Sequence, residues 1–306
     1  MINITKNTKV SKSKHLINKK YLSLLFFIAP ALILYITFFV IPMISGVYYS
    51  FTDWNALNQT FKFLGLKNYI EAIKDDKYFM DSIIFTLKYA VVLVVSQNIF
   101  AIALAVLIDS KKRGNGFFRT IFFIPNMISM IISSFVWVFI FTKVLSEIST
   151  KTHIAFLNSS WLGEPKLAFI AILIVSLWVG VGYMMLIYLA ALQGVPQELK
   201  EASIIDGASP FQTFFKITLP LIMHAITICT FLTLSTGFKA FDIIYALTGG
   251  GPVRSTTVMG LNIYNEAFNG NMRFAYASAK SIILFLIILV ITLIQLGVLK
   301  RKEIEA

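Results

Sequence analysis

Long apolar runs separated by short polar segments dominate the chain. A helix needs about 20 apolar residues to cross a bilayer, and six runs are long enough. They cover residues 21–44, 82–108, 120–141, 167–191, 217–238 and 276–299. The pattern predicts an all-α polytopic integral membrane protein with six transmembrane helices. The first run exceeds the apolar core of a signal peptide, about 7–15 residues, so we expect a retained span.

This pattern divides the chain into segments around a membrane core. We expect residues 82–299 to form a core of five helices that includes a polar loop at 192–220. The predicted segments before and after the core are residues 1–20 (a basic tail), 21–44 (the first span), 45–81 (a loop) and 300–306 (a second tail).

Composition excludes a soluble protein, because 57% of the 306 residues are apolar and only 14% are charged. Soluble domains carry about 25% charged residues. The net charge of +12 does not indicate nucleic-acid binding, since Lys and Arg cluster just outside the apolar runs. These clusters are Lys6, Lys9, Lys12, Lys14, Lys19 and Lys20, then Lys111, Lys112 and Arg113, and finally Lys300, Arg301 and Lys302. Basic residues remain on the cytoplasmic side. We therefore expect both termini and residues 111–119 inside, with residues 45–81, 142–166 and 239–275 outside.

The ionisable residues bear on the source of energy. Gradient-driven carriers keep ionisable groups at membrane depth, yet the apolar runs hold no Asp or Glu away from their ends. Lys88 and Lys280 lie near the predicted outer ends of their spans, where we expect their side chains to extend to water. We expect His224 to have a packing role. The other polar residues in the runs are neutral: Gln97, Asn98, Asn126 and Gln295. A gradient-driven carrier is disfavoured on this evidence.

The chain also lacks a phosphate-binding loop, because none of its 16 glycines is followed by Lys. Energy for uphill transport would therefore come from another polypeptide. The single cysteine, Cys229, allows no internal disulfide and no Cys-built metal site, and we expect no metal site in the chain.

The stretch QELKEASIIDGASPFQTFFKITLPL, residues 197–221, interrupts the apolar pattern with two locally terminated helices. Gly207 occupies a position where a helix ends in the left-handed conformation. Ser209, Pro210 and Gln212 then provide an N-cap, a first-turn proline and a capping-box partner. Such a structured cytoplasmic loop is expected to dock a partner. The alternative is an amphipathic loop that lies on the membrane surface.

The same stretch is similar to the signature of binding-protein-dependent ABC importer permeases, E-A-A, three residues, G, nine residues, I-x-L-P. The matching residues are Glu201, Ala202, Ser203 (in place of Ala), Gly207, Ile217, Leu219 and Pro220. The resemblance implies that this loop, including Asp206, is the coupling helix, which seats in a groove of a cytoplasmic ATPase subunit.

Other stretches resemble carbohydrate-uptake permeases related to the large membrane subunit of the maltose transporter. They are APALILYITFFVIPMISGVYYSFTDWN (29–55), FLGLKNY (63–69), FFRTIFFIPNMIS (117–129) and FDIIYALTGGGP (241–252). Ala275 departs from the usual Gly, and the chain resembles the short six-span members.

The resemblance implies a type I ABC importer transmembrane domain in a bacterial cytoplasmic membrane. It also implies a second homologous permease, two ATPase subunits that carry ATP and Mg, and an external solute-binding protein. This chain would be a transport subunit without a cofactor of its own and not an enzyme.

By the same resemblance, residues of the fourth and fifth runs fall where the maltose subunit lines its sugar site. They are Gly180, Tyr183, Thr233, Thr236, Gly237 and Ala240. From helical spacing alone, packing is the better explanation of the aromatic residues of the fourth run. The outer-loop residues Gly249, Gly250, Gly251 and Pro252 would face the solute-binding protein, although a tight turn is the simpler interpretation of that stretch.

Several functions remain open beside sugar import. Uptake of glycerol phosphate or another polar solute by the same ABC mechanism is the main rival, and a strongly cationic midplane would favour it. A gradient-driven carrier would leave the docking loop unexplained. A receptor or scaffold could use that loop to bind a partner, and substrate-dependent stimulation of the ATPase would separate it from a transporter.

Overall fold

The computed structural model describes residues 24, 26–55, 60–110, 114–269 and 272–302. The described part is helical, and its one extended pairing is an isolated bridge between Thr52 and Phe63. Five of its helices are long and apolar enough to cross a membrane, and a bent pair of helices would make a sixth. The basic tail 1–20 and the cluster 111–113 lie outside the described residues.

Three of the predicted spans are continuous helices. They are α4 (Lys77–Asp109), α8 (Pro165–Gln193) and α15 (Phe274–Leu299). The first span passes through η1 (Ile36–Val40) into α2 (Ile41–Tyr49), so its helix ends beyond residue 44. In each case the apolar run predicts the helix, and the helix extends a few residues beyond the run at one or both ends.

The third predicted span, 120–141, is not one helix. Its segments are α5 (Asn115–Phe123), η3 (Ile124–Met127), α6 (Met130–Phe139), η4 (Ile140–Val144) and α7 (Leu145–Thr152), followed by η5 (Ala155–Asn158). The break lies at Ile128, whose backbone is extended at φ −84° and ψ 137°. Pro125 contributes because it has no N–H to donate within a helix. The prediction of a continuous helix was wrong here.

The fifth predicted span, 217–238, is also broken. The loop helices α9 (Gln197–Ile205), α10 (Pro210–Thr213), η6 (Phe214–Thr218) and α11 (Leu219–Leu221) precede α12 (Met223–Phe238). The helix axis turns by 72° between Leu221 and Met223. Residues 217–221 therefore belong to the polar loop's second helix, and only α12 continues into the bundle.

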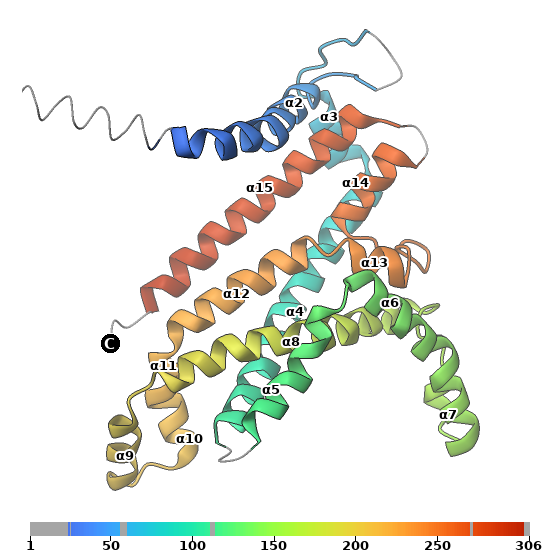
Figure 1. Ribbon diagram of the computed structural model, residues 1–306. Helices are drawn as coiled ribbons and strands as arrows, with labels where there is room; N and C mark the ends of the chain where they lie inside the picture. The colour runs from blue at the N-terminus through green and yellow to red at the C-terminus, as the bar shows by residue number, and fades with distance from the viewer. Residues whose placement is uncertain (1–23, 25, 56–59, 111–113, 270–271, 303–306) are drawn as a thin grey trace, which may run out of the picture.

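Helix α4 lies in the middle of the bundle and packs mainly against α8 and α12 (Figure 1). Small residues make this close packing possible, since Ala90, Ala101 and Ala105 are fully buried on α4. The first helix instead leaves the bundle in Figure 1, and none of its apolar window is buried within this chain. Its apolar surface is available to lipid or to another protein.

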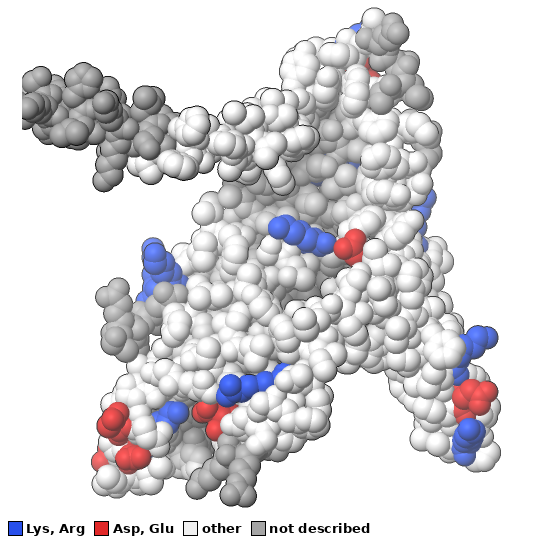
Figure 2. Space-filling view, viewed as in Figure 1, with Lys and Arg blue, Asp and Glu red and all other residues white. Residues whose placement is uncertain are grey.

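Short helices cover the end of the bundle opposite α9 and α10. They are α3 (Lys67–Ile70), η2 (Glu71–Asp75), α13 (Asp242–Leu247) and α14 (Met259–Phe268), while η7 (Lys300–Lys302) ends the described chain. Charged side chains gather at the extremities of the face in Figure 2, apart from a blue and a red side chain drawn near its middle.

Lys280 corrects one expectation from the sequence. Its side chain is only 1% exposed, and its ammonium forms ion pairs of 2.8 Å with both Asp76 and Glu266. It does not extend to water, because carboxylates from the N-cap of α4 and from α14 reach it inside the protein.

Candidate functional site: a polar cavity and a capped polar loop

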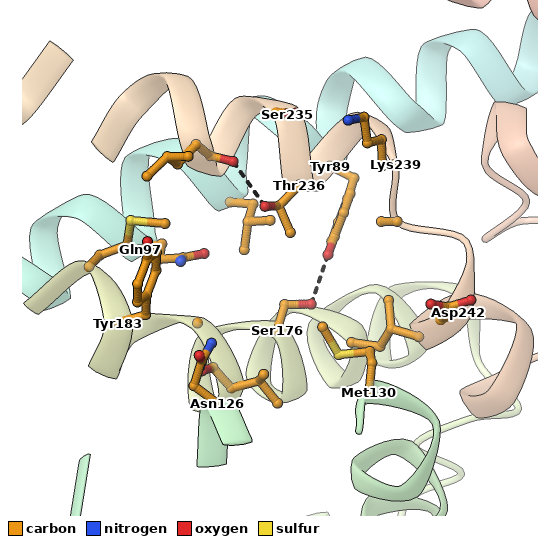
Figure 3. Close-up of a pocket in the computed structure, with 17 residues that line it drawn as sticks. Tyr89, Gln97, Asn126, Met130, Ser176, Tyr183, Ser235, Thr236, Lys239 and Asp242 are labelled. Atoms are coloured by element: carbon orange, nitrogen blue, oxygen red, sulfur yellow. Dashed lines mark hydrogen bonds between the residues drawn. The ribbon is translucent and has the colours of Figure 1, made fainter. Parts of the chain in front are cut away.

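A cavity of about 390 Å³ lies between α4, α8 and α12, at the point where the third span is broken (Figure 3). Its walls contain Tyr89, Leu93, Gln97, Asn126, Met130, Ser176, Val179, Gly180, Tyr183, Met184, Leu232, Ser235, Thr236, Lys239, Ala240, Asp242 and Ile243. The irregular backbone around Asn126 lines this cavity. Broken helices at membrane depth are typical of transporter binding sites.

Four of the six predicted path residues line the cavity: Gly180, Tyr183, Thr236 and Ala240. Thr233 and Gly237 do not. Thr233 is fully buried, and its hydroxyl donates a hydrogen bond to the Cys229 carbonyl at 2.8 Å. A Cβ on Gly237 would lie 3.1 Å from the Cα of Ala90. These two residues are four apart on α12, so they share the face that packs on α4, while Thr236 points to the cavity.

Gly180 and Gly182 closely precede Tyr183 in the sequence, and two such glycines are expected to leave room for a ligand, but Gly182 has a different role. A Cβ on Gly182 would lie 1.8 Å from the carbonyl oxygen of Phe122. This glycine does not leave room for a ligand. It lets the backbone of α5 contact α8, which holds the broken third span against the fourth.

Sequence reasoning missed several polar groups of the cavity. Gln97 and Asn126 both line it, and Tyr89 and Ser176 form a 2.7 Å hydrogen bond between their hydroxyl oxygens on its wall (Figure 3). The available signal was the presence of neutral polar residues inside apolar runs. By contrast, Tyr188 lies outside the cavity and donates a 2.5 Å hydrogen bond to Asn98.

The charges of the cavity are balanced. Lys239 and Asp242 are its ionisable residues of opposite sign, at the end of α12 and the start of α13. The remaining polar lining consists of amides and hydroxyls, and Tyr183 contributes an aromatic ring. Apolar walls with a few convergent hydrogen-bonding groups are the usual composition of a small-molecule site. The arrangement suits a neutral hydroxylated molecule.

The polar loop at 192–220 has the local structure that its sequence predicts. Helix α9 ends at Gly207, whose φ is +79°, and Ala208 donates its N–H to the Ser203 carbonyl at 2.9 Å. Ser209 caps α10, and the reciprocal hydrogen bonds with Gln212 measure 3.3 and 2.8 Å. The two helix ends are therefore fixed by backbone and capping interactions within the loop.

Ser203 has a role that the signature did not reveal. Its hydroxyl oxygen lies 2.8 Å from that of Thr213, and Ser203 is only 5% exposed. An Ala at this position could not form that hydrogen bond. Ser203 thus joins α9 to α10 and sets their relative position.

The signature residues divide into a buried group and an exposed group. Ser203 is buried and Leu219 packs against the core, whereas Glu201, Ala202 and Asp206 are exposed. Large apolar side chains accompany the exposed group: Leu199, Ile204, Ile205, Phe211 and Phe215. Ile205 is 86% exposed and Phe211 is 72% exposed. An apolar surface of this kind on a charged loop is typical of a site that contacts another protein or the membrane surface.

The stretch at Gly249, Gly250, Gly251 and Pro252 forms a tight turn after α13. Gly249 and Gly250 have φ values of +59° and +87°, a conformation that favours glycine. The Thr256 hydroxyl donates to the Gly251 carbonyl at 2.5 Å and closes the turn. In Figure 1 the adjoining α13 lies at the opposite end of α12 from α9.

Comparison with known proteins places this geometry in a family. The family model described as binding-protein-dependent transport system inner membrane component matches residues 97–303. AmyD of Thermoanaerobacterium thermosulfurigenes, a probable starch degradation products transport system permease protein, is 44% identical, over 91% of this chain and 94% of AmyD. MsmF of Streptococcus mutans, a multiple sugar-binding transport system permease protein, is 40% identical, over 93% of this chain and 97% of MsmF.

A further relative and a solved structure extend the comparison. UgpA of Escherichia coli O157:H7, an sn-glycerol-3-phosphate transport system permease protein, is 31% identical, over 96% of this chain and 99% of UgpA. One chain of a bacterial ABC transporter involved in alginate import superposes with a TM-score of 0.80 at 23% identity, and the match covers 95% of this chain and 99% of that one. At this identity the superposition shows a common fold.

Proposed function

Because this chain belongs to the family of binding-protein-dependent transport system inner membrane components, we propose that it is the permease subunit of an ATP-driven importer that carries a sugar or oligosaccharide into a bacterial cell. Family membership makes the chain a membrane transport subunit rather than an enzyme. The substrate is the part that this proposal adds.

The cavity between α4, α8 and α12 is the observation that carries the proposal. Sugars offer hydroxyl groups that both donate and accept hydrogen bonds, and their apolar faces stack on aromatic rings. The cavity provides amides and hydroxyls from four helical segments together with the Tyr183 ring. The names of AmyD and MsmF point to the same class of substrate.

Glycerol phosphate is the second candidate, because UgpA also covers nearly the whole chain. A phosphate group is commonly held by several cationic or N–H donors. Here the cavity lining contains Lys239 as its cation, and Asp242 offsets that charge. The balance of charge favours a neutral sugar over a phosphate.

The partners proposed for the chain follow from the same family. A second homologous permease would complete the path, two ATPase subunits would bind ATP and Mg, and a solute-binding protein would deliver the substrate from outside. A transporter of the same fold has been solved with an alginate-bound periplasmic protein. The exposed apolar residues of α9 and α10 offer the surface on which an ATPase subunit would seat.

In this mechanism ATP binding draws the two ATPase subunits together. The seated loop helices move with them, and the core helices turn the cavity from the inner to the outer side. This assignment places both termini and the loop 192–220 in the cytoplasm. The turn 249–252 would then face the solute-binding protein.

Uptake by the reconstituted complex tests the proposal. Proteoliposomes that contain the two permeases and the ATPase would be supplied with binding protein and either labelled starch-derived oligosaccharides or labelled glycerol 3-phosphate. We expect ATP-dependent uptake of the oligosaccharides. Uptake of glycerol 3-phosphate alone would contradict the sugar assignment.

A further inference from the structure

Gln97 on α4 is a buried amide in the cavity wall. The residue is only 3% exposed, and in the described part of the chain its side chain makes no hydrogen bond. Its neighbour Asn98 differs, because Asn98 donates to the Val94 carbonyl at 2.7 Å and accepts from Tyr188. The cavity lies beside this amide, so among the described residues only a molecule inside the cavity is left to pair with it. A bound ligand with hydrogen-bonding groups would take that place.

The Gln97 side chain occupies the space that Gly180 leaves open on α8. A Cβ at position 180 would lie 2.5 Å from Gln97 Nε2, 2.9 Å from Cδ and 3.0 Å from Oε1. Figure 3 shows the Gln97 amide directed into the cavity from the wall that also holds Tyr183. The absence of a side chain on Gly180 therefore determines where this amide lies.

From these contacts we infer that Gln97 binds a hydroxyl group of the transported molecule and that Gly180 acts by giving Gln97 its position. This inference rests on the proposed function and names the residue that would select its substrate class. An amide both donates and accepts hydrogen bonds. A sugar hydroxyl can use both properties, whereas an ionised phosphate oxygen only accepts. The amide therefore suits a hydroxyl group of the substrate better than a phosphate group.

The two residues are tested together by a double-mutant cycle on ATP-dependent uptake. The probes are labelled starch-derived oligosaccharides and labelled glycerol 3-phosphate, and the variants are measured with whichever probe the wild-type complex takes up. We expect Gln97→Ala to slow uptake about tenfold at limiting substrate, as the loss of one or two hydrogen bonds would do. Gly180→Ala displaces a flexible side chain rather than backbone, so it should fold and slow uptake to a similar extent.

The double variant gives the decisive measurement. In the Gln97→Ala background the atoms nearest to a Cβ at position 180 are gone, so Gly180→Ala should add almost nothing. If Gly180 contacted the substrate directly, the two losses would multiply instead. Multiplying losses, or unchanged uptake in Gln97→Ala, would overturn the inference.

Stability distinguishes a binding role for Gln97 from a structural one. Gln97→Leu replaces the amide by an apolar side chain of similar size. Because Gln97 makes no hydrogen bond within the described residues, the purified complex should melt at a temperature close to that of the wild type while its uptake falls. Gln97→Asn should retain part of the uptake because it keeps an amide. A melting temperature that falls together with uptake in Gln97→Leu would indicate a structural role and contradict the inference.

Two controls accompany these variants. Ser96 lies next to Gln97 on α4 but bonds to the Val92 carbonyl at 2.6 Å, so Ser96→Ala should leave uptake unchanged. Gly182→Ala would meet backbone rather than a side chain and should impair folding whether or not Gln97 is present. The wild-type preference between the two probes tests the proposed substrate separately, since the cycle is measured on the probe that is transported.

Discussion

The ammonium nitrogen of Lys280 lies 2.8 Å from Asp76 Oδ2, which joins the last span to the N-cap of α4. The same ammonium donates hydrogen bonds to Glu266 at 2.8 Å and to Asn262 at 3.0 Å. Arg273 adds a 2.6 Å ion pair with Glu71 at the edge of the same cluster. Segments from three parts of the chain are thus joined at one end of the bundle.

Replacing Lys280 with Met should destabilise the protein strongly. Removing one member of a buried ion pair leaves its partners charged and unpaired, which costs about 3–5 kcal/mol. The measurement is thermal unfolding of the purified protein in detergent. Lys88→Met is the control, because Lys88 lies over the Phe169 ring at 4.7 Å without an ion pair among the described residues. Equal melting temperatures for the two variants would contradict the role assigned to Lys280.

The same cluster predicts a loss of stability in acid. Burial of Asp76 opposes its ionisation, but hydrogen bonds from Lys280, the Phe79 N–H and Tyr276 outweigh it and hold the pKa of Asp76 below its usual 3.8. A carboxyl whose pKa is lower in the folded protein stabilises it above the unfolded pKa, and this contribution is lost as the pH falls through the folded value. We therefore expect the melting temperature to decrease when the pH is lowered below about 4.

Asp76→Asn tests the contribution of Asp76 to the acid response separately. Glu71 and Glu266 remain in this variant and still face Arg273 and Lys280. The variant should melt at a lower temperature at neutral pH and should respond less to acid than the wild type. An unchanged acid response would show that the other carboxylates determine it.

The sequence was sufficient for the features that depend on nearby residues. Apolar runs predicted α4, α8 and α15, and the caps at Gly207 and Ser209 follow rules that act within a few residues. The partners of Lys280 could not be predicted in this way. Asp76 lies about two hundred positions away in the sequence, so only the folded chain brings it to Lys280.

The breaks in the third and fifth spans were beyond the apolar pattern for a related reason. Apolar residues continue on both sides of Ile128 and of Ile222, and an apolar pattern does not report the direction of the helix axis. The close approach of Gly182 to Phe122 at the first break and the 72° turn at the second are seen only in the folded chain. The packing of Gly237 against Ala90 is likewise a contact between distant segments, so the sequence alone did not reveal it.

Cysteine labelling tests the orientation in the membrane. In a Cys229→Ser background, Asn115→Cys at the start of α5 should not react with a membrane-impermeant reagent added to intact cells, because residues 111–119 are expected inside. Val253→Cys is the matched control, since Val253 is 97% exposed in the turn after α13, which is expected outside. Labelling at position 115 together with no labelling at position 253 would show that the chain has the opposite orientation.

Tyr183 should contribute to transport through its ring. It lines the cavity and is 42% exposed, so Tyr183→Ala should still assemble with its partners. The loss of a stacked ring and one hydrogen bond corresponds to about 1–3 kcal/mol, or roughly 5- to 150-fold in uptake at limiting substrate. Tyr183→Phe separates the ring from the hydroxyl and should retain most of the activity. Normal uptake by Tyr183→Ala would place the substrate elsewhere.

Glu201 and Gly207 should affect the proposed coupling to an ATPase in different ways, although both lie in the polar loop at 192–220. Glu201 is exposed on α9, and within the described residues its side chain accepts a hydrogen bond from Gln197 at 3.3 Å. Glu201→Ala therefore removes a docking group and spares the local fold. Gly207 makes the turn at φ +79°, and a Cβ there would meet nothing within 4 Å. The penalty for Gly207→Val therefore comes from the backbone alone, about 1–3 kcal/mol, and it changes the angle between α9 and α10.

We expect Gly207→Val to lose ATPase association and uptake more severely than Glu201→Ala, with both proteins still inserted in the membrane. Gly207→Asn should be intermediate, because Asn tolerates the left-handed conformation better than a β-branched residue does. Co-purification of the ATPase with each variant, measured beside uptake, tests this order. If Gly207→Val bound the ATPase fully and transported normally, the loop would be a connector, and the exposed Ile205 and Phe211 would need another partner.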